Sequence, residues 1–122
     1  MQLRKSLYLD DVADVVQGRF NDLSRRHWER NVGWGVSDQI QRGYWVFHSF
    51  GNYGQVKGRG AECLREVCAL ADELGVELHL WTGSRALHPY YESFGFVKIE
   101  SPRYKADNVQ WFERGARCMT QG

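Results

Sequence analysis

The sequence predicts a single α/β domain over residues 1–122, in which helices cover both faces of a mixed sheet of about five to seven strands. Aromatic and β-branched residues predict a central strand over Gly43–Phe50. An amphipathic helix is expected over Arg59–Leu74, with Gly75 as its left-handed C-cap. Val76–Trp81 then alternates between apolar and polar residues like a strand. Strand, crossover helix and strand in this order predict a parallel pair.

The N-terminal part is expected to begin with a short strand over Leu3–Leu9. A helix with an N-cap at Asp10–Asp11 then runs to about Arg30. Its support is a set of residues at helical spacing, namely Val12, Val15, Val16, Phe20, Leu23 and His27. Gly18 interrupts this stripe, so one bent helix and two helices both fit. Asn31–Arg42 fits either a loop or a short, twisted strand.

Short elements complete the chain after the strand over Val76–Trp81. In order, they are a helix over Arg85–Phe94 that ends at Gly95, a strand over Phe96–Ile99, a loop over Ser101–Asn108 and a final strand over Val109–Arg114. Ser84 is placed to cap the short helix. Two earlier side chains have alternative roles. His27 is expected to be a packed, hydrogen-bonded histidine, and Trp34 to be either a buried anchor or a mobile aromatic beside a substrate.

The composition excludes several classes of protein. Apolar residues make up 43% of the chain and charged residues 25%, as in globular proteins, and a net charge of +1 argues against nucleic-acid or membrane-surface binding. No apolar run approaches the ~20 residues that span a bilayer, and the N-terminus lacks the pattern of a signal peptide. Cys63, Cys68 and Cys118 have no metal-ligand spacing, so reduced thiols in a cytoplasmic protein and no metal are expected. A monomer and a homodimer both remain open.

The stretch Gln55–Ala61 is the strongest indication of a binding site. Glycine spacing between a strand and a helix lets the backbone approach an anion, and the first helical N–H groups have no intrahelical partner. The helix dipole also favours phosphate there, and Lys57 and Arg59 add charge on either side of Gly58. An ordinary turn at the start of a surface helix explains the same residues. The common P-loop and dinucleotide patterns are absent.

Two motifs together resemble the GNAT superfamily of N-acetyltransferases. The loop reads Q/R-x-x-G-x-G/A as Gln55-x-x-Gly58-x-Gly60, and Tyr91–Phe96 reads Y-E-x-x-G-F. They occur in the family's order, on the expected elements, and with their strands they cover Gly43–Ile99, a little under half of the chain. The segment before the loop is shorter than in most members, so a strand or a helix of the substrate-recognising half is expected to be reduced or missing.

The resemblance implies a GNAT-like fold, acetyl-CoA as acyl donor and a primary amine of a small molecule or protein as acceptor. It implies that the strands containing Val46 and Leu78 are parallel neighbours that splay apart at their C-terminal ends. Tyr91 would protonate the departing thiolate, for which a neutral phenol is suited. The implied acetyl-CoA-binding residues are Phe50, Gln55, Val56, Lys57, Gly58, Arg59, Gly60, Ala61 and Ser84, of which Ser84 stands where many members have asparagine.

The sequence leaves the general base open. His48 is the candidate, because it lies on the strand that leads to the loop and histidine is the type of side chain that serves as a general base near neutral pH. A histidine packed among strand neighbours explains the same residue. His79 and His88 are weaker candidates, a water chain needs no side chain, and Glu92 is expected to be a surface residue.

Two functions from different classes therefore stand side by side. One is a small acetyl-CoA-dependent N-acetyltransferase. The other is a GNAT-like fold that has lost catalysis and serves as a binding module for a protein partner. A third interpretation, a minor virion, phage or mobile-element protein, rests on the compact size alone.

Overall fold

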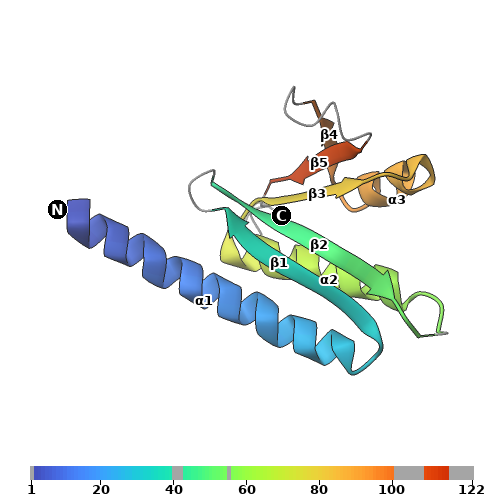
Figure 1. Cartoon of the computed structure of the whole chain (residues 1–122), viewed down its shortest axis with the longest axis horizontal. Helices are drawn as coiled ribbons and strands as arrows, with labels where there is room; N and C mark the ends of the chain where they lie inside the picture. Colours follow the sequence, from blue (N-terminus) through green and yellow to red (C-terminus); the bar gives the residue numbers. More distant parts are fainter. Residues whose placement is uncertain (1, 40–42, 55, 101–108, 116–122) are drawn as a thin grey trace.

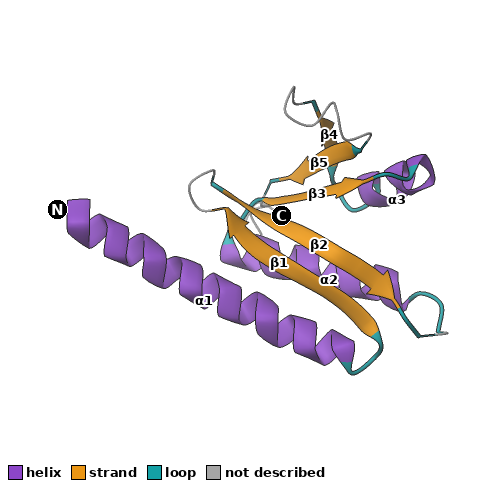
Figure 2. Ribbon diagram, viewed as in Figure 1, coloured by secondary structure: helices purple, strands orange, loops and turns teal. Residues whose placement is uncertain are grey.

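The computed structural model of the chain describes residues 2–39, 43–54, 56–100 and 109–115, and for 2–11, 38 and 39 it describes the backbone alone (Figure 1). Figure 2 shows the same view by secondary structure. The elements in chain order are α1 Gln2–Trp28, β1 Val32–Gln39, β2 Tyr44–Asn52, α2 Arg59–Leu74, β3 Leu78–Thr82, the 3-10 helix η2 Arg85–Leu87, α3 His88–Glu92, β4 Val97–Ile99 and β5 Gln110–Arg114.

The strands form one open, mixed sheet of five strands in the order β1-β2-β3-β5-β4. Only β2 and β3 are parallel, and α2 is the crossover helix that joins them. The other neighbouring pairs are antiparallel. The predicted mixed α/β sheet is thus confirmed at the level of a five-stranded α+β architecture.

The parallel strands separate after a short paired segment, as predicted. Their register contains two pairs, Trp45 with Leu78 and Val46 with His79. Beyond these pairs β2 continues beside β1, and β3 continues beside β5. A β-bulge lies in the diverging part of β2, where the register with β1 shifts and Ser49 has a φ of 59°. A bulge bends its strand and increases the local twist.

One face of the sheet carries the core. The register places Trp45 beside Leu78 and Leu78 beside Arg114, so these side chains share a face, which we call the helix face. Their three side chains are buried. The opposite face, which we call the open face, includes Val46 and His79.

All three α-helices pack on the helix face, so the prediction that helices cover both faces is wrong. Each helix contributes a contact: Phe20 of α1 with Trp45, Asp72 of α2 with Arg114, and Tyr91 of α3 with Phe112. The prediction came from the apolar residues on both sides of β2. On the open face those residues, Tyr44 and Val46, are only half-buried.

The predicted strand over Leu3–Leu9 is also wrong, because α1 is one helix from Gln2 to Trp28. The segment holds leucine, lysine and arginine, which are good helix formers, and no β-branched residue. Gly18 does not break the helix, and a side chain added there would meet open space. The first strand of the sheet is instead β1, in the region that the sequence left between loop and strand.

Several local predictions agree with the structure. Helix α2 has the predicted bounds, and Gly75 caps it in the left-handed conformation with a φ of 71°. Trp34 is a buried anchor, and His27 is buried beside Glu66, with 3.3 Å between Nε2 and a carboxylate oxygen. The predicted loop 101–108, Cys118 and Gln55 lie outside the described residues. No helix among the described segments has both the length and the apolar character that a membrane span requires.

Candidate functional site

A cleft of about 290 Å³ opens where β2 and β3 diverge. Its walls come from both faces of the sheet. Phe47 and Leu80 belong to the helix face, whereas His48 and Trp81 belong to the open face. Because residues of both faces line one cavity, the cleft passes through the gap in the sheet. Its volume is close to the lower end of the range for small-molecule sites.

Tyr91 closes the cleft on the helix face. It is 6% exposed and packs against Phe96 and Phe112, with ring centroids 6.2 and 6.0 Å away. Burial raises the pKa of Tyr91 above its ordinary value. The phenol therefore keeps its proton across the physiological range, as a proton donor to a departing anion must.

The N-terminus of α2 lies beside this cleft. Gly58 precedes the helix with a φ of 89°, a conformation that side chains other than glycine rarely adopt, and no side chain caps the helix. A Cβ added at Gly60 would be 3.4 Å from Cζ of Phe50, which itself lines the cleft. The N-terminus of α2, which the sequence predicts as a phosphate site, is thus adjacent to Phe50, which the sequence predicts as a contact for the donor.

Asn52 organises the loop between β2 and α2, a role that the sequence analysis missed. Its side-chain amide donates to the carbonyl of Val56 at 3.2 Å, and its side-chain oxygen accepts from the N–H of Gly54 at 3.2 Å. The second bond is the Asx turn that asparagine favours two residues before a glycine, so the signal was present in the sequence. Arg59, the first residue of α2, donates to the carbonyl of Arg30 at 3.3 Å, which connects the start of α2 to the turn after α1.

The remaining predicted loop residues lie differently. Val56 and Lys57 are exposed, and Ala61 is half-buried in the first turn of α2. Ser84 precedes the short helix as predicted, but its hydroxyl makes no capping bond, and its N–H donates to Thr82 at 3.1 Å. Glu92 is exposed, as expected.

His48 lies at the mouth of the cleft on the open face, held between two hydroxyl groups. Nε2 is 2.8 Å from Oγ of Ser37, and Nδ1 is 3.1 Å from Oγ of Ser49. The ring lies over Gly35, where an added Cβ would be 2.6 Å from Cε1 of the imidazole. His48 and Tyr91 line the same cleft from opposite faces.

A second groove of about 490 Å³ adjoins the cleft, and it was not predicted as a cavity from the sequence. The two cavities share His48 and Ser49. Trp28 and Tyr53 form an aromatic wall with ring centroids 6.0 Å apart, although both are more than half exposed. An added Cβ at Gly33 would lie 3.0 Å from Trp28 and 3.1 Å from Tyr53, so this glycine lets both rings lie on the strand.

The two weaker base candidates lie elsewhere. His88 contacts the ring of Phe112 edge-on at 5.3 Å. His79 faces Glu77 and Glu113 on the open face. Neither lines the cleft or the groove.

No family model matches the chain, and no significant match was found among curated proteins or solved structures.

Proposed function

We propose that the protein is an N-acetyltransferase that moves the acetyl group of acetyl-CoA to a primary amine. The observation that carries the proposal is the cleft between the parallel strands, which has the N-terminus of α2 beside it and the buried phenol of Tyr91 in its wall. Of the two motifs that resemble GNAT enzymes, the second supplies Tyr91 to the wall of the cleft. The first lies next to the cleft, because a Cβ added at Gly60 would be 3.4 Å from Phe50, which lines it.

In this proposal the α2 N-terminus binds the pyrophosphate of the donor. The N–H groups of Arg59, Gly60 and Ala61 occupy the first turn, where a helix provides no internal acceptors. Lys57 is exposed beside them and adds positive charge. The pantetheine arm then follows the separated edge of β2 past Phe50 into the cleft.

The chemistry requires the acceptor's ammonium group to lose two protons and the sulfur to gain one. His48 is placed to accept the first, directly or through a water, and passes it to solvent. The neutral amine attacks the thioester carbonyl, its nitrogen releases the second proton to water, the C–S bond breaks, and Tyr91 donates its proton to the thiolate. The phenol recovers its proton from solvent, so that free CoA and an acetylated amine are the products.

In this proposal the acceptor enters through the aromatic groove. The groove lies between the end of α1 and the sheet, where Ser24, Arg25 and Trp28 line it, and it shares His48 with the cleft. Trp28 and Tyr53 would pack against the apolar part of the acceptor or against its ammonium group. An amine with an adjoining apolar or aromatic group therefore fits better than a highly charged polyamine.

Calorimetric titration tests donor binding directly. We expect acetyl-CoA and CoA to bind with one site per chain, and acetyl-pantetheine, which lacks the pyrophosphate, to bind at least about tenfold more weakly. Thiol release with a panel of aryl, alkyl and peptide amines then tests turnover. Absence of acetyl-CoA binding would refute the proposal.

A binding module that has lost catalysis is the second candidate. Among the described residues, α1 precedes β1 and no strand pairs with its outer side, so β1 is an edge strand of the sheet. An edge strand can pair with an extended segment of another protein. Tight acetyl-CoA binding without turnover on the whole amine panel would favour this candidate.

A further inference from the structure

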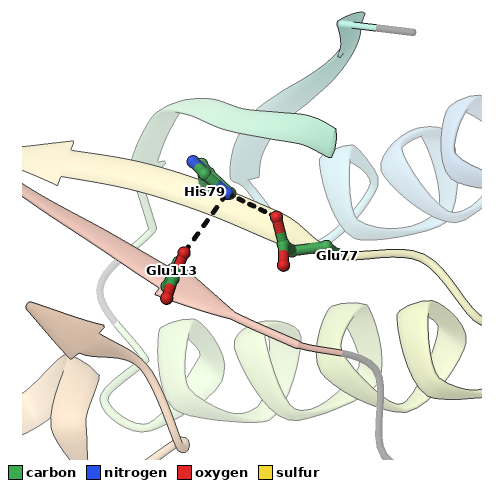
Figure 3. A group of neighbouring side chains, drawn as sticks. All are labelled: Glu77, His79 and Glu113. Atoms are coloured by element: carbon green, nitrogen blue, oxygen red, sulfur yellow. Dashed lines mark hydrogen bonds and ion pairs between the residues drawn. The ribbon is translucent and has the colours of Figure 1, made fainter. Parts of the chain in front are cut away.

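A second cluster of chemical groups lies on the open face, outside the cleft and the groove. Glu77 directly precedes β3, His79 lies within β3, and Glu113 is the partner of His79 across the β3–β5 ladder (Figure 3). Nε2 of His79 is 2.8 Å from Oε2 of Glu77 and 3.9 Å from Oε2 of Glu113. One ligand atom from each of the three residues lies within 4.8 Å of the others.

The imidazole is held in place, while the carboxylates remain accessible. His79 is 8% exposed, and its ring stacks on Tyr44 with centroids 3.8 Å apart and an interplanar angle of 11°. Nε2 of the stacked ring faces both glutamates, and Figure 3 shows the two contacts as dashed lines. The side chains of Glu77 and Glu113 are 41% and 44% exposed, so a solvated ion can reach them.

The charges in the cluster do not balance. Nε2 carries at most one proton, and it faces two carboxylates. With a neutral imidazole the three side chains carry a charge of about −2, and with a protonated imidazole about −1. Within the described part of the chain, the ion pairs of Glu77 and Glu113 are both with His79, and neither involves lysine or arginine.

We propose that Glu77, His79 and Glu113 form a binding site for a divalent transition-metal ion of the zinc type. One imidazole nitrogen and two carboxylate oxygens are a donor set that Zn²⁺ accepts, with a water as fourth ligand. Zinc–nitrogen and zinc–oxygen distances of about 2.0–2.2 Å require ligand atoms closer together than a 4.8 Å span. Rotation of the half-exposed glutamate side chains supplies that adjustment without movement of the strands.

The ion would join β3 to β5 beside the paired segment of β2 and β3. His79 is the partner of Val46, the last residue of β2 that pairs with β3 before the strands diverge. The site would thus stabilise the base from which the cleft opens, and it has no part in the acetyl transfer. Sequence spacing gave no indication of the site, because Glu113 reaches it from a different strand, 34 positions along the chain from His79 by their numbers (113 − 79).

The test titrates Zn²⁺ into tag-free, full-length protein after treatment with EDTA, followed by calorimetry and by thermal unfolding. We expect one ion per chain and, at about a hundred times Kd, a rise in Tm of roughly 5 °C or more. Glu113→Gln should weaken zinc binding about tenfold or more and leave the Tm without zinc nearly unchanged. Co²⁺ in place of zinc should give the visible absorption of a site with nitrogen and oxygen ligands, and Glu113→Gln should alter that spectrum.

Glu66→Gln is the matched control. Glu66 also faces a buried histidine, His27, and its side chain is 45% exposed, but that histidine has one carboxylate partner instead of two. Zinc binding should be unaffected by this variant. Glu77→Gln is a second probe if Glu113→Gln unfolds. The proposal is overturned if the wild type binds no zinc, if zinc binding survives both probes, or if Glu66→Gln abolishes it.

Discussion

The two ends of the β2–β3 pair differ although the same strands form both. At the closed end Trp45 pairs with Leu78, and the neighbouring Arg114 is held by Asp72 of α2. At the open end the strands share no pair beyond Val46, and the cleft lies between them. One end therefore holds the fold together, and the other leaves room for a ligand.

The cleft does not arise from a lack of apolar residues. Phe47 and Leu80 line it, yet they are 3% and 2% exposed and belong to the core. The strands separate because each follows its other neighbour, and the bulge at Ser49 bends β2. Backbone geometry, rather than a change of composition, thus separates a binding cavity from a packed core.

The largest effect is expected at the closed end. Arg114 donates two hydrogen bonds to Asp72, at 2.8 and 2.9 Å, and a third to the carbonyl of Phe94 at 2.9 Å. Arg114→Leu would remove both of these hydrogen bonds from the largely buried Asp72 carboxylate, and breaking such a pair by removing one side typically costs about 3–5 kcal/mol. We expect the free energy of unfolding, measured with urea, to fall by this amount.

Arg19→Leu provides the control, because the Arg19–Glu73 pair also joins an arginine to α2 but is about half exposed. Its loss should cost about 1 kcal/mol or less. Equal losses in the two variants would contradict the view that the closed end is the stabilising one.

The next effect concerns catalysis at the open end. Tyr91→Phe keeps the ring that packs on Phe112 and removes the hydroxyl group. Turnover should fall about a hundredfold or more, with kcat and kcat/KM reduced together and acetyl-CoA affinity nearly unchanged. Tyr90→Phe is the neighbouring control and should retain turnover. If Tyr91→Phe keeps full activity on a good amine substrate, the phenol serves only in packing.

A smaller effect is expected on donor binding. Gly60→Val adds a side chain in the first turn of α2, where the nearest described atom to a new Cβ is 3.4 Å away on Phe50. The fold should therefore persist, while the approach of a phosphate to the helix N–H groups is obstructed. Affinity for acetyl-CoA should fall about tenfold, or about 1.4 kcal/mol.

Gly18→Val is the control for the change in side chain, since Gly18 is exposed in α1 and has open space around it. It should bind acetyl-CoA like the wild type. Undiminished binding by a folded Gly60→Val protein would show that α2 does not hold the pyrophosphate.

The smallest effect concerns Cys63, a fully buried residue of α2. Burial raises the pKa of the Cys63 thiol from 9.0 to about 12. The folded chain keeps this proton at a pH where the unfolded chain releases it, so stability falls as pH rises from 9 toward 12. By about pH 9.5 the loss should be roughly 1 kcal/mol. Cys63→Ala should have a shallower alkaline slope in urea unfolding, and identical slopes would refute the assignment.

The sequence predicted the central unit because local and tertiary signals agree there. Helix α2 carries its own amphipathic stripe and its glycine cap, and β2 is dense in aromatic residues. The strand over Leu3–Leu9 failed because seven residues without clear periodicity give no secure assignment, and helix propensity prevailed.

Other parts of the candidate site depend on contacts that no local pattern encodes. The groove joins Trp28 of α1 to Tyr53 of the loop after β2. The separate cluster of Glu77, His79 and Glu113 likewise joins residues of β3 and β5 that lie far apart in the sequence. The bulge at Ser49 is equally invisible, because a serine with positive φ has no sequence signature. Helices cover only one face of the described sheet because α1 and α2 pack against each other there, for example through His27 and Glu66. The residue pattern of β2 alone does not determine this packing.

Because Gly35 contacts His48, a substitution at Gly35, which does not itself line the cleft, would affect the proposed chemistry. One methyl group on the neighbouring strand would occupy the place of the imidazole, since the added carbon would be 2.6 Å from Cε1. Gly35→Ala would thus displace His48, the proposed base, while every residue that lines the cleft stays unchanged. A descendant of this protein would lose the proposed activity by that single replacement, while its two sequence motifs stayed complete.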